Sequence, residues 1–461
     1  MTKESRWTIF CAVLVIAVPA AAQSDYFSTA PVSMKSLSDV IRSVGSVTAP
    51  DDFILPHRQK GRSRCKSCRK TSCGCGEASA LDKAIAGSHK GVFYDNNFDY
   101  LCDPGYDQWW PGDRLKRLDL WGLGMLDIGG QYRIRLHNER HLRGFGLTGN
   151  NDDFLLHRLR LYANLQLGDR FRVFAEMLDA HSAGEDFAPL VIEENRIDLQ
   201  NAFVDLRVWQ GGCGDLWVRA GRQELLYGAQ RTFSPLDWAN TRRTFEGYKV
   251  FWKGQNWNVD AFYARPMRRD VNSLDSANYD REFMGFYSTY KGAEDATTDL
   301  YYLRFNDETT PFQFDTLGAR FAGSRNGTLW DFEAAYQWGE FAGVNHSAGA
   351  YTLGVGWKSD CHPWKTTVWS FYDWASGSSV ANNGYHHLFP LVHKYFGFMD
   401  LFGRRNIKDW NTLVTISPHK KLKLLMWYHV FELQTILDTP YNINMTAFNA
   451  GSAPGSTDLG R

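Results

Sequence analysis

The most regular feature of the chain is a two-residue alternation of apolar and polar side chains, which persists from about residue 126. In one segment, Leu159 and Leu161 alternate with Arg158 and Arg160. Comparable alternation covers residues 131–137, 171–177, 201–208, 216–220, 248–253, 257–263, 317–321 and 330–338. Because successive side chains of a β-strand point to opposite faces, each segment predicts a strand with one apolar and one polar face.

The connections between these segments alternate between short and long. Gly168 and Asp169 form one tight turn, and residues 253–256 form another. The connections at 140–153 and 180–195 are longer and rich in Gly, Asn and Asp. Short turns at one rim and long loops at the other are typical of transmembrane β-barrels.

The stretch 221–247 concentrates charge between two alternating segments. Gly and Pro interrupt it, and it contains Arg222, Glu224, Arg231, Arg242 and Arg243. We predict a strand, a charged connection and a second strand, with the charges facing an enclosed aqueous space.

Length and composition favour a barrel over a soluble sandwich. A chain of 461 residues is long for one soluble core, whereas a barrel wall grows with strand number. Aromatic residues make up 15% of the chain, which suits belts at two membrane interfaces. No apolar run after the N-terminus approaches the ~20 residues of a spanning helix. The sequence therefore predicts an all-β fold, a single antiparallel transmembrane β-barrel of about 18 strands.

The N-terminus has the features of a targeting segment. Lys3 and Arg6 precede a mostly apolar stretch at 7–18, and three alanines at 20–22 form a small-residue cleavage site. We predict a signal peptide over residues 1–22, an irregular periplasmic extension over 23–110 and an outer-membrane barrel over 111–461.

The predicted extension contains four closely spaced cysteines: Cys65, Cys68, Cys73 and Cys75. Four thiols at this spacing fit either zinc or an iron–sulfur cluster, or the disulfides of a small exported segment. Because the signal peptide directs the chain out of the reducing cytosol, we favour disulfides. The overlapping basic run at 57–70 is interpreted as a solvated face, with contact to lipid headgroups or an anionic polymer as the alternative.

The polar faces of the predicted strands carry many arginines, namely Arg133, Arg135, Arg158, Arg160, Arg172, Arg207, Arg219 and Arg320. A guanidinium group stays charged and grips carboxylates in a two-pronged geometry, so a lumen lined with them would offer a polyanion many weak contacts. Candidate carboxylate partners include Glu176, Asp205, Glu224 and Asp260. The alternative for each residue is an ion pair of the wall without substrate contact. The net charge of zero excludes a global basic field for nucleic acid.

Candidate chemistry for an enzyme is sparse. His386 and His387 follow Ser376 and Ser378, but no Gly-x-Ser-x-Gly elbow marks a nucleophile. The paired histidines could bind a metal, although loop histidines more often have a structural role. No phosphate-binding loop or dinucleotide motif is present, so the sequence predicts no cofactor.

Several stretches resemble the alginate export family of outer-membrane porins. The most specific begins Gly221-Arg-Gln-Glu-Leu-Leu-Tyr-Gly and continues to the Arg-Arg pair at 242–243. The others lie at 126–135, 153–163, 192–205, 329–339, 372–377 and 389–400. The likeness covers roughly residues 95–461 and assigns no role to the extension before it.

The resemblance implies a barrel with an electropositive pore for an anionic uronate polymer. By motif position it assigns lumen or constriction roles to Arg133, Arg135, Arg158, Arg160, Arg219, Arg222, Glu224, Arg231 and Arg243. Barrels of this kind end in an amphipathic strand with a terminal aromatic residue, whereas this sequence ends at Thr457-Asp-Leu-Gly-Arg, so we expect closure to need one further strand.

We therefore expect a passive outer-membrane channel for an anionic polysaccharide or its oligomers, in contact with outer-membrane lipid and with periplasmic export proteins as candidate partners. The alternatives are a porin for small carboxylates and a barrel enzyme acting on lipid or polysaccharide.

Overall fold

The computed structural model describes residues 14–16, 80–359, 362–419, 421–448 and 455–460, with the backbone alone for 14–16. The four closely spaced cysteines and most of the predicted signal peptide lie outside these ranges. Their predicted roles remain predictions.

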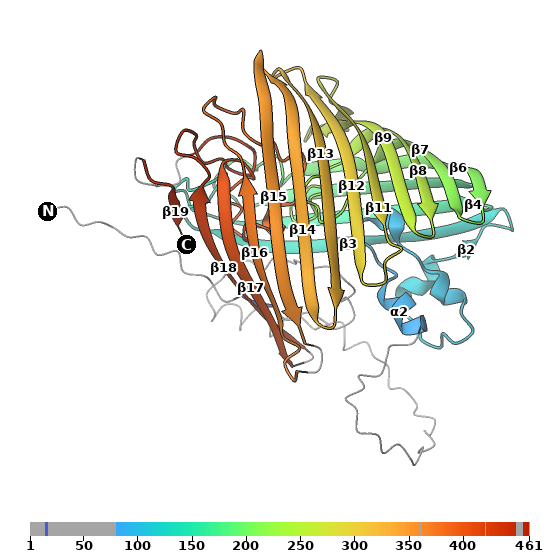
Figure 1. Ribbon diagram of the computed structural model, residues 1–461. Coiled ribbons are helices and arrows are strands. Elements are labelled where there is room, and N and C mark those ends of the chain that lie inside the picture. The colour runs from blue at the N-terminus through green and yellow to red at the C-terminus, as the bar shows by residue number, and fades with distance from the viewer. Residues whose placement is uncertain (1–13, 17–79, 360–361, 420, 449–454, 461) are drawn as a thin grey trace.

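The described chain is built almost entirely of antiparallel strands, which form one 19-stranded sheet (Figure 1). The long strands are β3 (Gly124–Glu139), β4 (Asp152–Leu167), β5 (Phe171–Ala183), β6 (Asn195–Gly211), β7 (Gly214–Gln223), β8 (Phe245–Gly254), β9 (Trp257–Arg268), β11 (Arg281–Tyr290), β12 (Ala296–Asp307), β13 (Phe312–Arg325), β14 (Thr328–Phe341), β15 (Val344–Lys358), β16 (Thr367–Ala375), β17 (Ile407–His419) and β18 (Leu422–Leu433). The short strands are β1 (Leu14–Ile16), β2 (Leu118–Asp119), β10 (Ser276–Ala277) and β19 (Asp458–Gly460). The predicted all-β fold is confirmed.

Helical segments are short and are not part of the sheet. They are α2 (Ala80–Ala86), η3 (Phe93–Asp95), η4 (Asp99–Cys102), η5 (Pro111–Leu115) and η6 (Val392–Lys394). No helix in the described part of the chain is long and apolar enough to span a membrane.

The alternation in the sequence correctly sorts the two faces of the wall. On β4, Arg158 and Arg160 face inward with exposures of 0% and 2%, whereas the outward-facing Leu161 is 46% exposed. On β3, Tyr132 and Ile134 point outward and are 60% and 54% exposed. The outward rows are apolar because they face lipid, and the inward rows carry the charged side chains.

Exposed tryptophans lie near both ends of the barrel, with Trp338 and Trp410 at the end of the long connections and four others where the connections are short. Trp209, Trp257, Trp357 and Trp364 all lie within a few residues of short connections and are at least 40% exposed. An indole ring carries both an apolar body and a polar N–H, so it suits the boundary between lipid and water. The high aromatic content is therefore explained in part by an interfacial belt.

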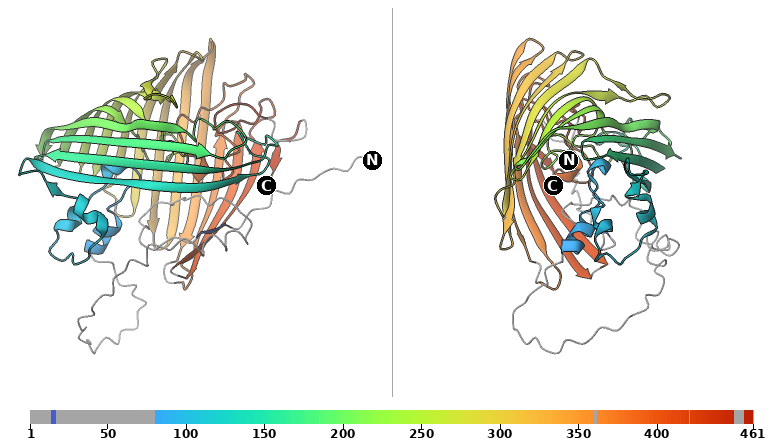
Figure 2. Two further views of the ribbon diagram at one scale, coloured as in Figure 1. Left: turned by 180° about the vertical axis from the view of Figure 1, so that it is seen from behind. Right: turned by 90° about the vertical axis from the view of Figure 1, so that its right-hand side faces the viewer.

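The sheet curves around an inner space, with β3 at one edge and β18 at the other (Figure 2). Successive strands pair from β3 through β18, with β10 as a short addition to β9. At the edges, β2 pairs with β3, while β1 and β19 pair with β18. Within the described residues β3 and β18 are not paired with each other, so these strands do not close the barrel directly.

The segment before the barrel also enters the inner space, a feature for which the resemblance assigns no role. Val92, Tyr94 and Phe98 are buried, and they lie N-terminal to the predicted domain boundary at residue 111. Tyr94 packs against Phe174 of β5 and Phe203 of β6, with ring centroids 5.9 and 5.2 Å apart. Part of the predicted periplasmic extension thus covers the inner wall.

We expect Tyr94→Ala to release this segment from the wall. The buried ring is lost together with its hydroxyl hydrogen bond to the Glu224 carbonyl (2.6 Å), and burying a Phe-sized ring typically contributes about 3–5 kcal/mol. Hydrogen exchange of the amides of residues 91–95 should accelerate strongly. The control Tyr100→Ala removes a ring that contacts Tyr106 outside the wall and should leave this exchange unchanged. Equal protection in both variants would show that Tyr94 is not the anchor.

Candidate functional site

Two long connections fold into the barrel and meet each other. We call residues 224–244, between β7 and β8, inner loop A, and residues 376–406, between β16 and β17, inner loop B. The Ser234 N–H donates to the Phe389 carbonyl (2.9 Å), and the Phe389 N–H donates to the Thr232 carbonyl (2.9 Å). The loops therefore form a short parallel ladder inside the barrel. The predicted strand, charged connection and strand over 221–247 are confirmed. The expectation that the charges face an aqueous space is wrong for Arg222, Glu224, Arg231 and Arg242, which are buried in ion pairs.

Aromatic packing fixes this contact to the wall. Phe233 of loop A is fully buried, and its ring centroid lies 5.7 Å from that of Phe389 and 5.1 Å from that of Phe283 on β11. Trp238 of loop A stacks on His393 of loop B at 3.6 Å between centroids. Because rings from both loops and the wall interlock, the loops form a partition held across part of the lumen.

An arginine cluster ties loop A to the strands at β3 to β5. We define it as Arg133, Arg135, Arg158, Arg160 and Arg242 together with the carboxylates of Glu176, Glu224 and Asp237. Arg160 Nε lies 2.6 Å from Glu176, Arg158 Nη2 lies 2.9 Å from Asp237, and Arg242 donates to Glu224. The cluster joins side chains that are far apart in the sequence.

Two members of the cluster bind loop A without an ion pair among the described contacts, through carbonyl oxygens and, for Arg135, also through the Trp238 ring. Arg133 Nη1 donates to the Asp237 carbonyl (2.9 Å), and Arg135 Nη1 donates to the Trp238 carbonyl (2.6 Å). The carboxylates of Glu193 and Asp400 also act on Arg135, so its charge is partly compensated. The Asp237 side chain is 55% exposed, so one edge of the cluster reaches water in the lumen.

Other predicted pore residues are paired within the wall. Asp205 lies 2.7 Å from Arg219 on β7 and 3.6 Å from Arg172 on β5. Arg222 lies 3.2 Å from Asp198 on β6. Such pairs compensate buried charge and brace neighbouring strands, since a guanidinium without a partner is costly to bury.

Arg207 and Arg231 also form ion pairs, one at the rim and the other inside the barrel. Arg207 is paired at the short-turn rim, 3.6 Å from Asp215, and also contacts Asp169. Arg231 of loop A reaches β14, where it lies 2.9 Å from Asp331 and 2.7 Å from Glu333. Arg231 therefore anchors loop A on the side of the barrel opposite its arginine cluster.

Arg243 joins the two inner loops. Its Nη1 donates to the carbonyls of Ser234 in loop A (3.4 Å) and Pro390 in loop B (3.3 Å), and its guanidinium lies 5.5 Å from the Phe389 ring centroid. Burial and the nearby charge of Arg269 lower the pKa of Arg243 to about 9. In the described residues no carboxylate lies within ion-pair distance of Arg243, so its charge also adds to the positive character of the partition.

The N-terminal segment also contacts these arginines, which the sequence did not predict. Arg242 Nη2 donates to the Gly91 carbonyl (3.1 Å), and the Arg160 guanidinium lies 3.8 Å from the Phe93 ring centroid. The aromatic residues at 93, 94 and 98, in an extension with weak alternation, are the signal that could have indicated a packed segment.

The serines and histidines considered for catalysis lie in loop B and have structural partners. Ser376 Oγ accepts the Gly349 N–H (3.0 Å), and Ser378 Oγ accepts the Val380 N–H (3.1 Å). Among the described residues, no group of three or more His, Cys, Asp or Glu could hold a metal ion.

The two histidines accept backbone N–H groups within loop B. His386 Nδ1 lies 3.0 Å from the Leu388 nitrogen, and His387 Nδ1 lies 3.3 Å from the Arg404 nitrogen. Burial lowers the pKa of both histidines well below the ordinary value, so they remain neutral at physiological pH.

The profile of the alginate export family matches residues 125–461. The chain belongs to the alginate export family. The matched range contains β4 through β19, both inner loops and the arginine cluster. The resemblance noted in the sequence is confirmed, and this membership assigns the protein to the outer membrane as a β-barrel of porin type.

Comparison with solved structures and curated sequences gives only distant likeness. Pseudomonas aeruginosa OpdO has 12% identity and a TM-score of 0.48, covering 72% of this chain and 82% of that one. OccK8 (OprE) of the same organism has 12% identity and a TM-score of 0.44, covering 67% and 83%. The outer-membrane protein OprD, also from Pseudomonas aeruginosa, has 10% identity and a TM-score of 0.43, covering 67% and 74%. No match is found among curated protein sequences.

Proposed function

We propose that this alginate export family barrel passes an anionic polysaccharide, or oligomers of it, past an arginine-lined partition by passive transport. The observation that carries the proposal is that Arg133 and Arg135 bind loop A without an ion pair in the described residues. A fixed excess of positive charge beside water concentrates anions. The low-dielectric protein walls of a constriction strengthen that effect.

The arginines are held in a way that allows only weak binding of a passing substrate. Each of these arginines already binds a carboxylate or carbonyl of the protein, so a passing uronate would gain only a few additional hydrogen bonds. Weak and repeated contacts of this kind let a ligand both enter and leave. No covalent step is needed, and the protein is proposed to act as a channel and not as an enzyme.

The partition also favours a second candidate within the same class. Inner loops A and B occupy part of the lumen and are locked by rings from both sides, which narrows the passage compared with an empty barrel. A narrow, positively charged passage would also select small carboxylates, so this porin is the alternative to a polysaccharide channel.

Planar-bilayer recording tests the proposal. We expect an anion-preferring current in a salt gradient, with dose-dependent interruption by uronate oligomers and little interruption by neutral oligosaccharides of equal length. A cation-preferring current, or equal interruption by both oligomers, would contradict a passage selective for anionic saccharides. Small carboxylates that permeate while oligomers neither enter nor block would favour the alternative porin.

Arg133→Gln is the most informative single substitution. Arg133 is half-buried and binds carbonyl oxygens of loop A, so glutamine can keep some of that bonding while removing the charge. We expect the anion-to-cation permeability ratio to fall by about twofold or more. The matched control is Arg140→Gln. It removes an exposed charge in the loop after β3 that pairs with Asp153 on β4. If both variants keep the wild-type ratio, the cluster does not set selectivity.

A further inference from the structure

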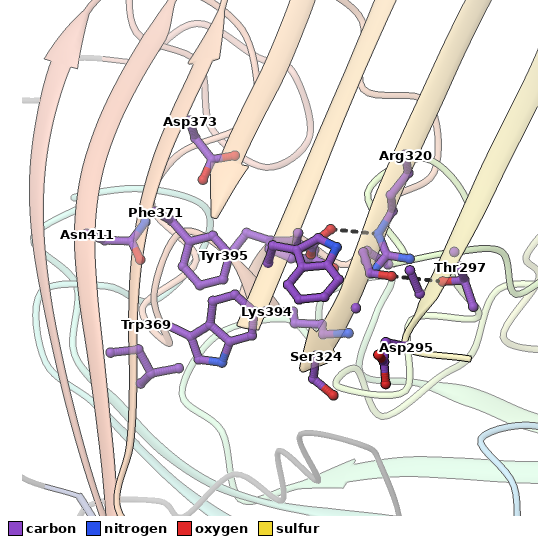
Figure 3. A pocket seen from close by; sticks show the side chains of 18 of the residues that line it. Asp295, Thr297, Arg320, Ser324, Trp369, Phe371, Asp373, Lys394, Tyr395 and Asn411 are labelled. Atoms are coloured by element: carbon purple, nitrogen blue, oxygen red, sulfur yellow. Dashed lines mark hydrogen bonds and ion pairs between the residues drawn. The ribbon is translucent and has the colours of Figure 1, made fainter. Parts of the chain in front are cut away.

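A recess of about 850 Å³ opens on the inner wall beside inner loop B and shares no residue with the arginine cluster (Figure 3). In Figure 3 the rings of Trp369 and Phe371 lie together on one side of it. Arg320 and Asp295 lie on the opposite side, and the Lys394 side chain extends between the two sides. Its volume is within the range of about 300–1,000 Å³ that is typical of small-molecule sites.

Trp369 and Phe371 form a flat aromatic platform on β16. Their ring centroids are 5.0 Å apart and the ring planes differ by 17°. Their cross-strand partners on β15 are Gly356 and Gly354, where a Cβ atom would come within 2.8 Å of the Trp369 ring and 2.3 Å of the Phe371 ring. The two glycines therefore let both rings lie over the β15 backbone. Both side chains are only half-buried and line the recess.

A flat aromatic surface beside water matches the chemistry of a sugar ring. A pyranose presents a face of C–H groups that packs on an aromatic face through dispersion and weak C–H contacts. Its hydroxyl groups require polar partners at the ring edge, which Asp295, Ser324 and Asn411 supply around the recess. The indole N–H of Trp427, another lining residue, donates to Asn411 (2.9 Å) and fixes its orientation.

Charge in the recess is arranged so that a carboxylate can approach Lys394. Asp373 pairs with Arg404 of loop B at 2.5 Å, and Asp331 pairs with Arg231 at 2.9 Å. The Lys394 ammonium has three N–H donors, so it can bind an anionic group that enters the recess in addition to the groups already around it.

We propose that the recess is a binding subsite for one pyranose ring of a uronate oligomer in transit, stacked on Trp369 and Phe371 with its carboxylate directed toward Lys394. The inference rests on the proposed function, because it names a second contact on the path of the same substrate. The arginine cluster would attract the polymer by charge, whereas this subsite would recognise the sugar ring itself.

The test is the dwell time of single blocking events produced by a uronate tetramer in planar bilayers. Trp369→Leu and Phe371→Leu keep an apolar side chain over the glycines but remove the flat ring. We expect each substitution to shorten the dwell time about three- to tenfold. The matched control is Trp410→Leu on β17, which removes an outward-facing ring that is 58% exposed and should leave the dwell time unchanged.

The outcomes separate this subsite from the channel function. If the wild-type protein carries no anion-preferring current, the proposed function itself fails. If wild-type current is interrupted by the uronate tetramer but both leucine variants retain the wild-type dwell time, only the subsite is overturned. A neutral glucose tetramer should block more briefly than the uronate tetramer, and Lys394→Gln should reduce that difference. Equal dwell times for both tetramers in the wild-type protein would overturn the assignment of the carboxylate to Lys394.

The pH dependence of the block gives an additional prediction. Burial and the charge of Arg231 lower the pKa of Lys394 to about 8. The charged groups that face it are Arg231 of loop A, Arg320 of β13, and Asp331 and Glu333 of β14, with the Tyr395 hydroxyl adjacent. Lys394 is charged below its pKa and neutral above it, so uronate block should be longer at pH 7 than at pH 9. Lys394→Gln should reduce this change, although Arg243, with its pKa of about 9, still titrates in that variant. An unchanged pH dependence in Lys394→Gln would contradict the role of Lys394.

Discussion

The double variant Phe233→Ala, Phe389→Ala should conduct about twofold more current than the wild-type barrel, or more. Each loop loses the ring that it inserts into the shared aromatic core. Removal of a fully buried Phe ring such as that of Phe233 typically costs about 3–5 kcal/mol, and the partly buried Phe389 ring adds to this loss. The wall is held by its own backbone ladder, so we expect the loops to detach while the barrel persists. Single-channel conductance in planar bilayers measures the effect.

Phe286→Ala is the matched control, because this ring faces outward from β11 and is 43% exposed. It should leave conductance at the wild-type value. Hydrogen exchange of residues 230–236 shows independently whether the loops have detached. If exchange accelerates while conductance stays constant, the partition does not limit the passage, and the site that selects the substrate lies elsewhere in the lumen.

The second large effect concerns stability. Arg242 and Glu224 are both fully buried and paired, and Glu224 also accepts a hydrogen bond from Gln200 (3.2 Å). Arg242→Leu leaves the Glu224 carboxylate with weaker compensation inside the barrel, and loss of one partner of a buried pair typically costs about 3–5 kcal/mol. We expect the temperature at which the folded barrel unfolds in detergent to fall by several degrees.

The exposed pair of Arg140 and Asp153 provides the comparison. Its side chains are 49% and 60% exposed, so Arg140→Leu should cost less than about 1 kcal/mol and leave the unfolding temperature almost unchanged. Equal shifts in the two variants would show that burial does not distinguish these ion pairs, and the arginine cluster would then not be a structural anchor of loop A.

The faces of the wall could be predicted because they depend on local geometry alone. Arg160 and Leu161 are neighbours in the chain, and a strand must place them on opposite sides whatever lies around it. The order of the strands was equally accessible, since consecutive segments joined by short connections pair as hairpins. The charged stretch after β7 was recognised as a connection because Gly and Pro interrupt its alternation.

The partners of those charges could not be predicted, because they depend on which distant segments meet inside the barrel. Loop A meets loop B more than a hundred residues later, and nothing in either stretch specifies that Phe233 and Phe389 become neighbours. The same holds for Tyr94, whose place on the inner wall depends on Phe174 and Phe203 being brought together by pairing of β5 with β6.

The amino-acid pattern was therefore sufficient for the strand periodicity, the lipid-facing rows, the inward arginines and the family, since each depends on residues that are neighbours in the sequence. Only the tertiary structure decided which charges are compensated and how the two loops form a partition. It also decided where the N-terminal segment inserts and how the aromatic platform lies beside Lys394. The physical reason is that a charge or a ring acquires its energetic role from the groups packed around it, and in this barrel those groups come from distant parts of the chain.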